Sequence, residues 1–205
     1  MLGLSSLSQT TINLRRTKQC VLNLASDAMG DSINDLARAT GTKNVPALKI
    51  GLGYTYVKDK FGVFGLTALP SDLVKPPCIQ ECPVQMEAEL TDTHEMTKDL
   101  PDRAGAILAL EVKILRVHID EELRLVGHQN RIDADKWRPM VMSFQELYGL
   151  AKKKVVPSQL ARIKEEMYKI LTRSDVVRQG GDIDLIERDT EDRSEEDIEV
   201  LEVRP

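Results

Sequence analysis

Two long runs of alternating apolar and polar residues constrain the fold of this chain more than any other feature. The first run begins at Val84, and its apolar residues alternate with polar ones: Val84, Met86, Ala88 and Leu90 against Gln85, Glu87, Glu89 and Thr91. A period of two is typical of a β-strand with one buried face and one solvated face. The sequence therefore predicts a strand whose solvated face carries Glu87 and Glu89.

The second run begins at Ala106 and has a shift in its pattern. Its first half places Leu108, Leu110, Val112 and Ile114 on one face, whereas Leu115, Val117 and Ile119 continue on the opposite parity. A β-bulge near Ile114 and Leu115 would keep one face in the core. Two long antiparallel strands with a bulge indicate the wall of a small barrel.

Shorter elements are expected around these two strands. The sequence predicts strands near the N-terminus and at residues 20–24, a helix that starts at Ser26 or Asp27 and ends near Gly41, and a last short strand at residues 140–144. Residues 69–83 contain four prolines, which lack the amide that a β-ladder needs, so this arm should be irregular with only short extended pieces.

The chain is expected to have one domain and two C-terminal segments. The domain covers residues 1–150, and a helical segment covers 151–173, with its helix opened by Pro157 and Ser158. Residues 174–205 form an acidic tail, predicted to be disordered because it has too little apolar surface to offset its ordering entropy. Short apolar patches at 183–186 and 198–203 leave docking as strands as an alternative.

Composition argues against several classes of function. A net charge of −5 and an aromatic content of 4% argue against a nucleic-acid-binding surface. No apolar run approaches the roughly 18 residues that a membrane span needs, and no signal peptide is recognisable. The three cysteines then read as reduced thiols, and we expect a cytoplasmic protein.

Motifs for metal binding and covalent catalysis are not evident. Cys78 and Cys82 have no second ligand pair nearby in sequence, so we expect buried structural cysteines and no metal site. A redox or metal sensor built on these two thiols is an alternative. Neither a nucleophile elbow nor a glycine-rich phosphate loop is present, and no catalytic residue is assigned.

A cluster of hydroxyl and basic side chains lies near the N-terminus. Its members are Ser5, Ser6, Ser8, Thr10, Thr11, Asn13, Arg15 and Arg16. Hydroxyls and amides on a strand-to-helix turn, with guanidinium groups close by, suit a phosphate monoester. An ordinary polar turn with an N-cap is the alternative interpretation.

Three blocks, taken in order, carry a family likeness. They are SLSQTTINLRRTKQCVLNL, then DKFGVFGLTALPSDLVKPPCIQECPVQMEAEL, then LEVKILRVHIDEEL followed by RIDADKWRPMVMSF. The Ser/Thr-rich turn before a short helix, and the Asp-Lys-Phe, Gly-Leu-Thr-x-x-Pro-Ser and Glu-Cys-Pro elements, resemble the flavin reductase-like family with an FMN-binding split β-barrel. The likeness covers residues 2 to about 149.

The resemblance implies a fold and a function. The fold would be mainly β, a split antiparallel β-barrel of the Greek key type with two or three peripheral helices. FMN would bind between the subunits of a homodimer, with NADH or NADPH as electron donor and a flavin-dependent oxygenase as a possible partner. Hydride transfer at the flavin would explain the lack of a catalytic constellation.

The resemblance also implies the residues that bind the cofactor. Ser8, Thr10 and Thr11 would line the phosphate end, with Arg15 or Arg16 close by. Lys60 and Phe61 match the family's Lys-Phe pair near the flavin.

The chain departs from the family pattern at its start. Family members carry another stretch before the block that begins here at Met1, so the resemblance implies that the N-terminal part of the family domain, including its first barrel strands, is missing. The alternative function is therefore a truncated split-barrel homologue without catalytic activity, acting as a dimeric interaction protein.

Overall fold

The computed structural model describes residues 1–150, 156, 158 and 202–204. The helix expected from Pro157 and most of the acidic tail lie outside the described residues. All elements named below belong to one compact unit, which includes residues 1–150 and 202–204.

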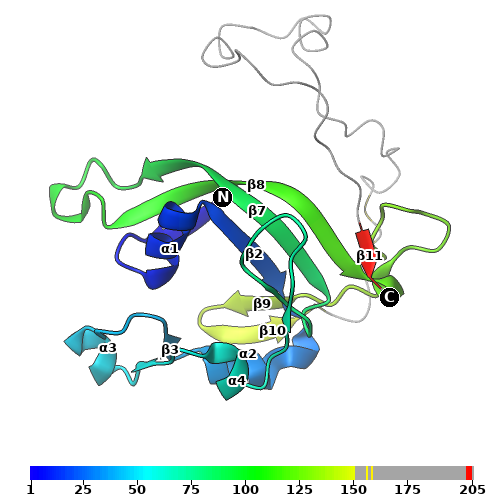
Figure 1. Ribbon diagram of the computed structural model, residues 1–205, viewed down its shortest axis with the longest axis horizontal. Helices are drawn as coiled ribbons and strands as arrows, with labels where there is room; N and C mark the ends of the chain where they lie inside the picture. Colours follow the sequence, from blue (N-terminus) through cyan, green and yellow to red (C-terminus); the bar gives the residue numbers. More distant parts are fainter. Residues whose placement is uncertain (151–155, 157, 159–201, 205) are drawn as a thin grey trace, which may run out of the picture. The chain divides into compact units, whose positions relative to one another are not determined.

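The centre of this unit is an antiparallel sheet with the strand order β1-β8-β7-β2. Its strands are β1 (Leu2–Ser5), β2 (Gln19–Leu24), β7 (Val84–Glu95) and β8 (Ile107–Asp120). Figure 1 shows β7 and β8 as two long strands that curve together, with β2 alongside β7. The two long runs of the sequence therefore form neighbouring strands, as predicted.

The β7–β8 register contains the predicted bulge. Glu87 is paired with Arg116, but the next residue of β7, Ala88, is paired with Ile114, so Leu115 is the extra residue on β8. A second irregularity, between Leu90 and Asp92 of β7, was not predicted. An extra residue bends its strand and increases the local twist, which suits a curved sheet.

The described part of the chain contains four helices, where two or three were expected. They are α1 (Gln9–Thr17), α2 (Gly30–Leu36), α3 (Ala47–Gly51) and α4 (Lys60–Val63), and a 3₁₀ turn at Asp27–Met29 leads into α2. The unexpected ones are the single-turn helices α3 and α4. Among the described residues, no helix has the length and apolar character to cross a bilayer.

Three small two-stranded sheets complete the unit. They pair β3 (Ala39–Thr40) with β4 (Thr55–Tyr56), β5 (Ala68–Leu69) with β6 (Cys78–Ile79), and β9 (Met140–Ser143) with β10 (Glu146–Gly149). β9 is the predicted last short strand, whereas β10 was not predicted. The arm at residues 69–83 is irregular with two short extended pieces, as expected.

The described end of the predicted tail contains β11 (Glu202–Arg204). This strand pairs in parallel with β8, with Glu202 opposite His118. It joins the edge of β8 that β1 also uses.

The main hydrophobic core lies between α1 and the sheet. Leu14 of α1 packs with Leu90, Leu108 and Leu110, and all four side chains are at least 92% buried. Leu90 comes from the predicted apolar face of β7, and the other two from that of β8. The patterns of both runs therefore identified this core correctly.

The predicted solvated face of β7 is wrong at its N-terminal half. Glu87 is 0% exposed and Gln85 only 4% exposed. The cause is the proline-rich arm, whose backbone at Asp72, Leu73 and Val74 lies against the Glu87 carboxylate. A charged side chain is buried this completely when donors replace its water.

Candidate functional site

Two of the predicted cofactor-binding hydroxyls stabilise the turn before α1. Ser8 is the N-cap of the helix, and its side chain accepts a hydrogen bond from the Thr11 amide. Thr11 is fully buried, and its hydroxyl donates to the Ser5 carbonyl at 2.7 Å and lies 2.8 Å from Ser8 Oγ. Ser8 is therefore an N-cap, as the alternative interpretation of this turn predicts, and Thr11 is bonded within the same turn.

Unlike Ser8 and Thr11, Thr10 and Arg15 of the same helix are open to solvent. Both side chains are exposed, Thr10 in the first turn and Arg15 in the last. The amides of Gln9 and Thr10 have no acceptor within the helix, because the first turn has no preceding carbonyls. Together with the helix dipole, these amides favour an anion at this end of α1.

The predicted Lys60 and Phe61 open α4. The Asp59 carboxylate caps this turn by accepting the Gly62 amide at 3.0 Å. The Lys60 ammonium donates to the Ala39 carbonyl at 2.9 Å, and burial lowers the pKa of Lys60. One of its three N–H donors is used in this bond, which leaves others for a ligand. Phe61 is half-buried.

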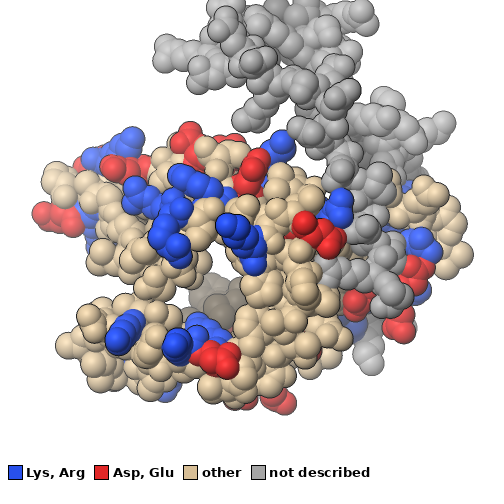
Figure 2. Space-filling view, viewed as in Figure 1, with Lys and Arg blue, Asp and Glu red and all other residues tan. Residues whose placement is uncertain are grey.

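Residues 39–41 connect the two predicted groups. Lys60 is bonded to Ala39, and Gly41 packs against Gln9 of α1, where a Cβ on Gly41 would lie 3.4 Å from Gln9 Cγ. The structure thus brings the start of α1 and the start of α4 to the same short segment. Figure 2 shows that this face of the unit is hollowed and that Lys and Arg side chains lie along the hollow.

A second cluster of functional groups was missed in the sequence. Glu87 of β7 accepts the amides of Asp72 at 2.9 Å, Leu73 at 2.6 Å and Val74 at 3.1 Å, and its Oε1 lies 2.6 Å from His118 Nε2. Burial alone would raise the pKa of this carboxyl, but the donated hydrogen bonds outweigh it and hold the pKa below its usual value. Glu87 therefore carries a buried negative charge.

Further bonds attach the arm to the sheet. Arg116 pairs with Asp72 at 3.1 Å, the Ile79 amide donates to Asn23 at 2.8 Å, and the Lys75 amide donates to Gln19 at 3.1 Å. The arm thus bonds to side chains from β2, β7 and β8.

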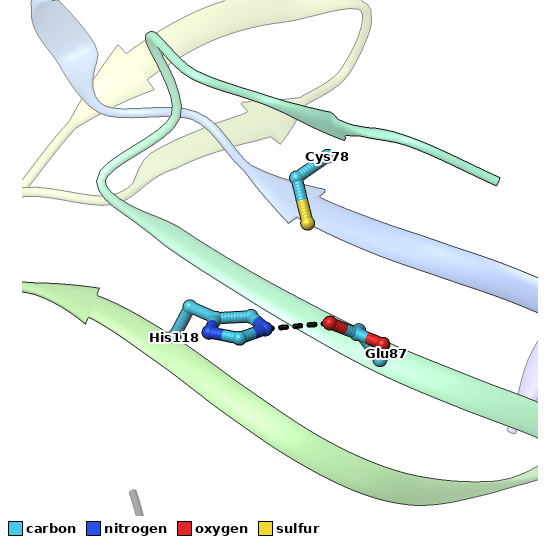
Figure 3. A group of neighbouring side chains, drawn as sticks. All are labelled: Cys78, Glu87 and His118. Atoms are coloured by element: carbon cyan, nitrogen blue, oxygen red, sulfur yellow. Dashed lines mark hydrogen bonds and ion pairs between the residues drawn. The ribbon is translucent and has the colours of Figure 1, made fainter. Parts of the chain in front are cut away.

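Both cysteines of the arm are buried, and they have different neighbours. Cys78 lies beside Glu87 and His118 (Figure 3). Burial, together with the charges of Glu81, Asp120 and Cys78, raises the pKa of Cys82 to about 11. A thiol with this pKa stays protonated and unreactive near neutral pH, which weighs against a redox sensor that uses Cys82. No sequence motif could have indicated the Cys78–Glu87–His118 cluster, because its members are far apart in the chain.

Thr11 and Thr10 offer a matched test of structural against ligand-binding roles. Thr11→Val keeps the side-chain shape but removes the hydroxyl that donates to the Ser5 carbonyl and lies beside the Ser8 hydroxyl. We expect it to lower the free energy of unfolding by about 1.5 kcal/mol, and Thr10→Val by less than about 0.5 kcal/mol. Urea unfolding followed by circular dichroism measures both, and equal losses would contradict the assignment.

Glu87 and Glu89 form a second matched pair on one strand. Glu87→Gln replaces an acceptor for three amides by a neutral group with one acceptor oxygen. We expect a loss of about 3 kcal/mol in the free energy of unfolding for Glu87→Gln and of less than about 0.5 kcal/mol for Glu89→Gln. Chemical denaturation at pH 7 gives both values. A Glu87→Gln variant as stable as the wild type would show that the amide contacts contribute no net stability.

Comparison with known proteins agrees with this fold. Residues 1–134 match the family described as flavin reductase like domain. The uncharacterized protein YdfE of Bacillus subtilis (strain 168) is 33% identical over 152 residues, which are 74% of this chain and 70% of that protein.

Solved structures show the same architecture. Flavoredoxin of Desulfovibrio vulgaris (Miyazaki F) aligns with a TM-score of 0.57 at 18% identity, covering 78% of this chain and 72% of its own. Nitrilotriacetate monooxygenase component B from Bacillus cereus aligns with a TM-score of 0.56 at 18% identity, covering 76% and 70%. The mainly β fold of the split-barrel type is therefore confirmed, and the chain belongs to the flavin reductase-like family.

Proposed function

We propose that this protein binds FMN and reduces flavin with NADH or NADPH. The observation that carries the proposal is that α1 and Lys60 meet at residues 39–41 in a member of the flavin reductase-like family. The N-terminus of a helix favours a phosphate group, and a half-buried ammonium stabilises negative charge on a ring beside it.

The residues present fit FMN in kind. The Thr10 hydroxyl and the first amides of α1 would hold the phosphate, with Arg15 or Arg16 adding charge. Lys60 and the half-buried Phe61 would border the flavin ring. Ser8 and Thr11 would contribute by fixing the start of the helix, since their hydroxyls bond within the turn.

When bound, FMN would accept hydride from the nicotinamide and supply reducing equivalents onward. The task of the protein is to bind and orient the flavin, which requires no acid–base pair from the chain. Lys60 would hold a positive charge beside the ring from a fixed position, because its bond to Ala39 restrains the side chain.

The similar solved structures suggest which kind of protein would receive the reduced flavin. One of the similar structures is component B of a nitrilotriacetate monooxygenase. By analogy, this protein would deliver reduced flavin to a flavin-dependent oxygenase.

We also propose a cytoplasmic location. The three cysteines form no disulfide in the described residues, which is usual for proteins of a reducing compartment.

Flavin titrations test both parts of the proposed site. Lys60→Met should weaken the binding of FMN and of riboflavin by at least about tenfold, because both carry the ring. Thr10→Val/Arg15→Ala should weaken FMN binding by a similar factor and leave riboflavin binding unchanged, because riboflavin lacks the phosphate. Quenching of flavin fluorescence measures the affinities, with Lys98→Met in the β7–β8 loop as control.

The outcomes separate the competing interpretations. A double variant that keeps its preference for FMN would contradict the proposed phosphate site. Wild-type protein that binds FMN but does not oxidise NADH or NADPH would contradict the reductase activity, while FMN would stand as the cofactor. A wild-type chain that binds no flavin would instead favour the non-catalytic interaction protein.

We also propose that the protein is a homodimer. The β9–β10 hairpin exposes Val141, Met142, Phe144 and Tyr148, and the Phe144 side chain is fully exposed. Phe144 and Gln145 have φ angles of 48° and 69°, as in a type I′ turn, where Asn and Gly are preferred. A large apolar side chain at such a position is explained by a surface that it contacts in a dimer.

The hairpin makes the dimer testable by one substitution. Phe144→Asn removes the apolar side chain and puts a preferred residue in the turn, so folding should be retained. We expect the dimer dissociation constant to rise by at least about tenfold, and Val126→Ser, at another exposed apolar position, to leave it unchanged. Sedimentation equilibrium gives both constants. A wild type that is monomeric throughout, or an unchanged Phe144→Asn variant, would contradict the proposal.

A further inference from the structure

Three side chains of the types that bind metal ions converge where the proline-rich arm lies on the sheet. Cys78 comes from β6, Glu87 from β7 and His118 from β8, and each residue is 0% exposed. Their ligand atoms all lie within 4.8 Å of one another. Figure 3 shows the His118 ring and the Glu87 carboxylate facing each other, with the Cys78 sulfur directed towards both.

We propose that Cys78, Glu87 and His118 bind a zinc ion. Thiolate, imidazole and carboxylate are the protein ligands that Zn²⁺ takes, commonly in a tetrahedral arrangement. The ion would replace the proton between His118 Nε2 and Glu87 Oε1, which are now 2.6 Å apart. In a tetrahedral site two such ligand atoms lie about 3.3 Å apart, so the pair must separate by less than 1 Å.

The groups around the three side chains suit a metal site. The amides of Asp72, Leu73 and Val74 fix the orientation of the Glu87 carboxylate and keep it anionic. The Ser71 hydroxyl lies 3.5 Å from Cys78 Sγ. Outer contacts of this kind orient metal ligands in proteins and raise the affinity of the site.

Asp72 is placed to act as the fourth ligand, or to hold a water in that position. Its Oδ2 lies 3.8 Å from His118 Nε2 and accepts a hydrogen bond from Arg116 at 3.1 Å, and its side chain is 42% exposed. On binding, the Cys78 thiol releases its proton to solvent, and His118 carries its proton on Nδ1 while Nε2 binds the ion.

The consequence is a zinc-linked attachment of the arm to the sheet. Cys78 belongs to the arm, whereas Glu87 and His118 belong to the two central strands. An ion bound by all three would tie the arm down more strongly than hydrogen bonds alone.

Cys78→Ser and Cys82→Ser provide a matched pair, because both thiols are buried but only Cys78 belongs to the cluster. The full chain is purified, stripped with a chelator and titrated with Zn²⁺ in competition with a coloured indicator. We expect one ion per chain for the wild type and Cys82→Ser, and an affinity at least about 100-fold weaker for Cys78→Ser.

Substitution with Co²⁺ identifies the ligand directly. A bound Co²⁺ with a thiolate ligand has a sulfur-to-metal charge-transfer band in the near ultraviolet, which should be present in Cys82→Ser and absent in Cys78→Ser. If the wild type takes up no metal, or if Cys78→Ser binds it as tightly with the band intact, the proposal is overturned and the cluster is a hydrogen-bonded group only. Circular dichroism confirms that both variants are folded.

Discussion

The arrangement of this protein depends on the hydrogen bonds that the buried carboxylate of Glu87 accepts. Three amides from the arm and the His118 ring replace the water that the charge has lost. A carboxylate in an apolar interior is tolerated only with such donors, so the arm can lie over the sheet only in the register that supplies them. The arm at residues 69–83, irregular by sequence, is thereby given one defined position.

The two long strands provide the rigid support for this arrangement. Their pairing places Glu87 and His118 on neighbouring strands, and the bulge at Leu115 corrects the parity of β8 so that its apolar residues continue to face inward. Without the extra residue, the second half of β8 would turn its apolar side chains outward. The bulge therefore links the sequence pattern to both the core and the cluster.

The proposed flavin site and the Cys78–Glu87–His118 cluster differ in how the chain builds them. The flavin groups lie on surface turns, at the start of α1 and of α4, joined through residues 39–41. The cluster lies within the wall of the sheet and is covered by the arm. A site for a large, exchangeable cofactor needs an open surface, whereas a structural ion needs a closed one.

Local sequence patterns determined much of this protein: the two long strands, the bulge, the Leu90–Leu108–Leu110 core face, the N-cap at Ser8 and the irregular arm. Each follows from alternation, parity or proline chemistry over a few residues. Only the tertiary structure decided that Glu87 is buried and that Cys78 lies beside His118 instead of a second cysteine pair. It also decided that α1 and Lys60 contact the same segment, residues 39–41. These contacts join residues that are far apart in the chain. A periodic pattern predicts which face of a strand a residue occupies, but it does not predict which other part of the chain covers that face.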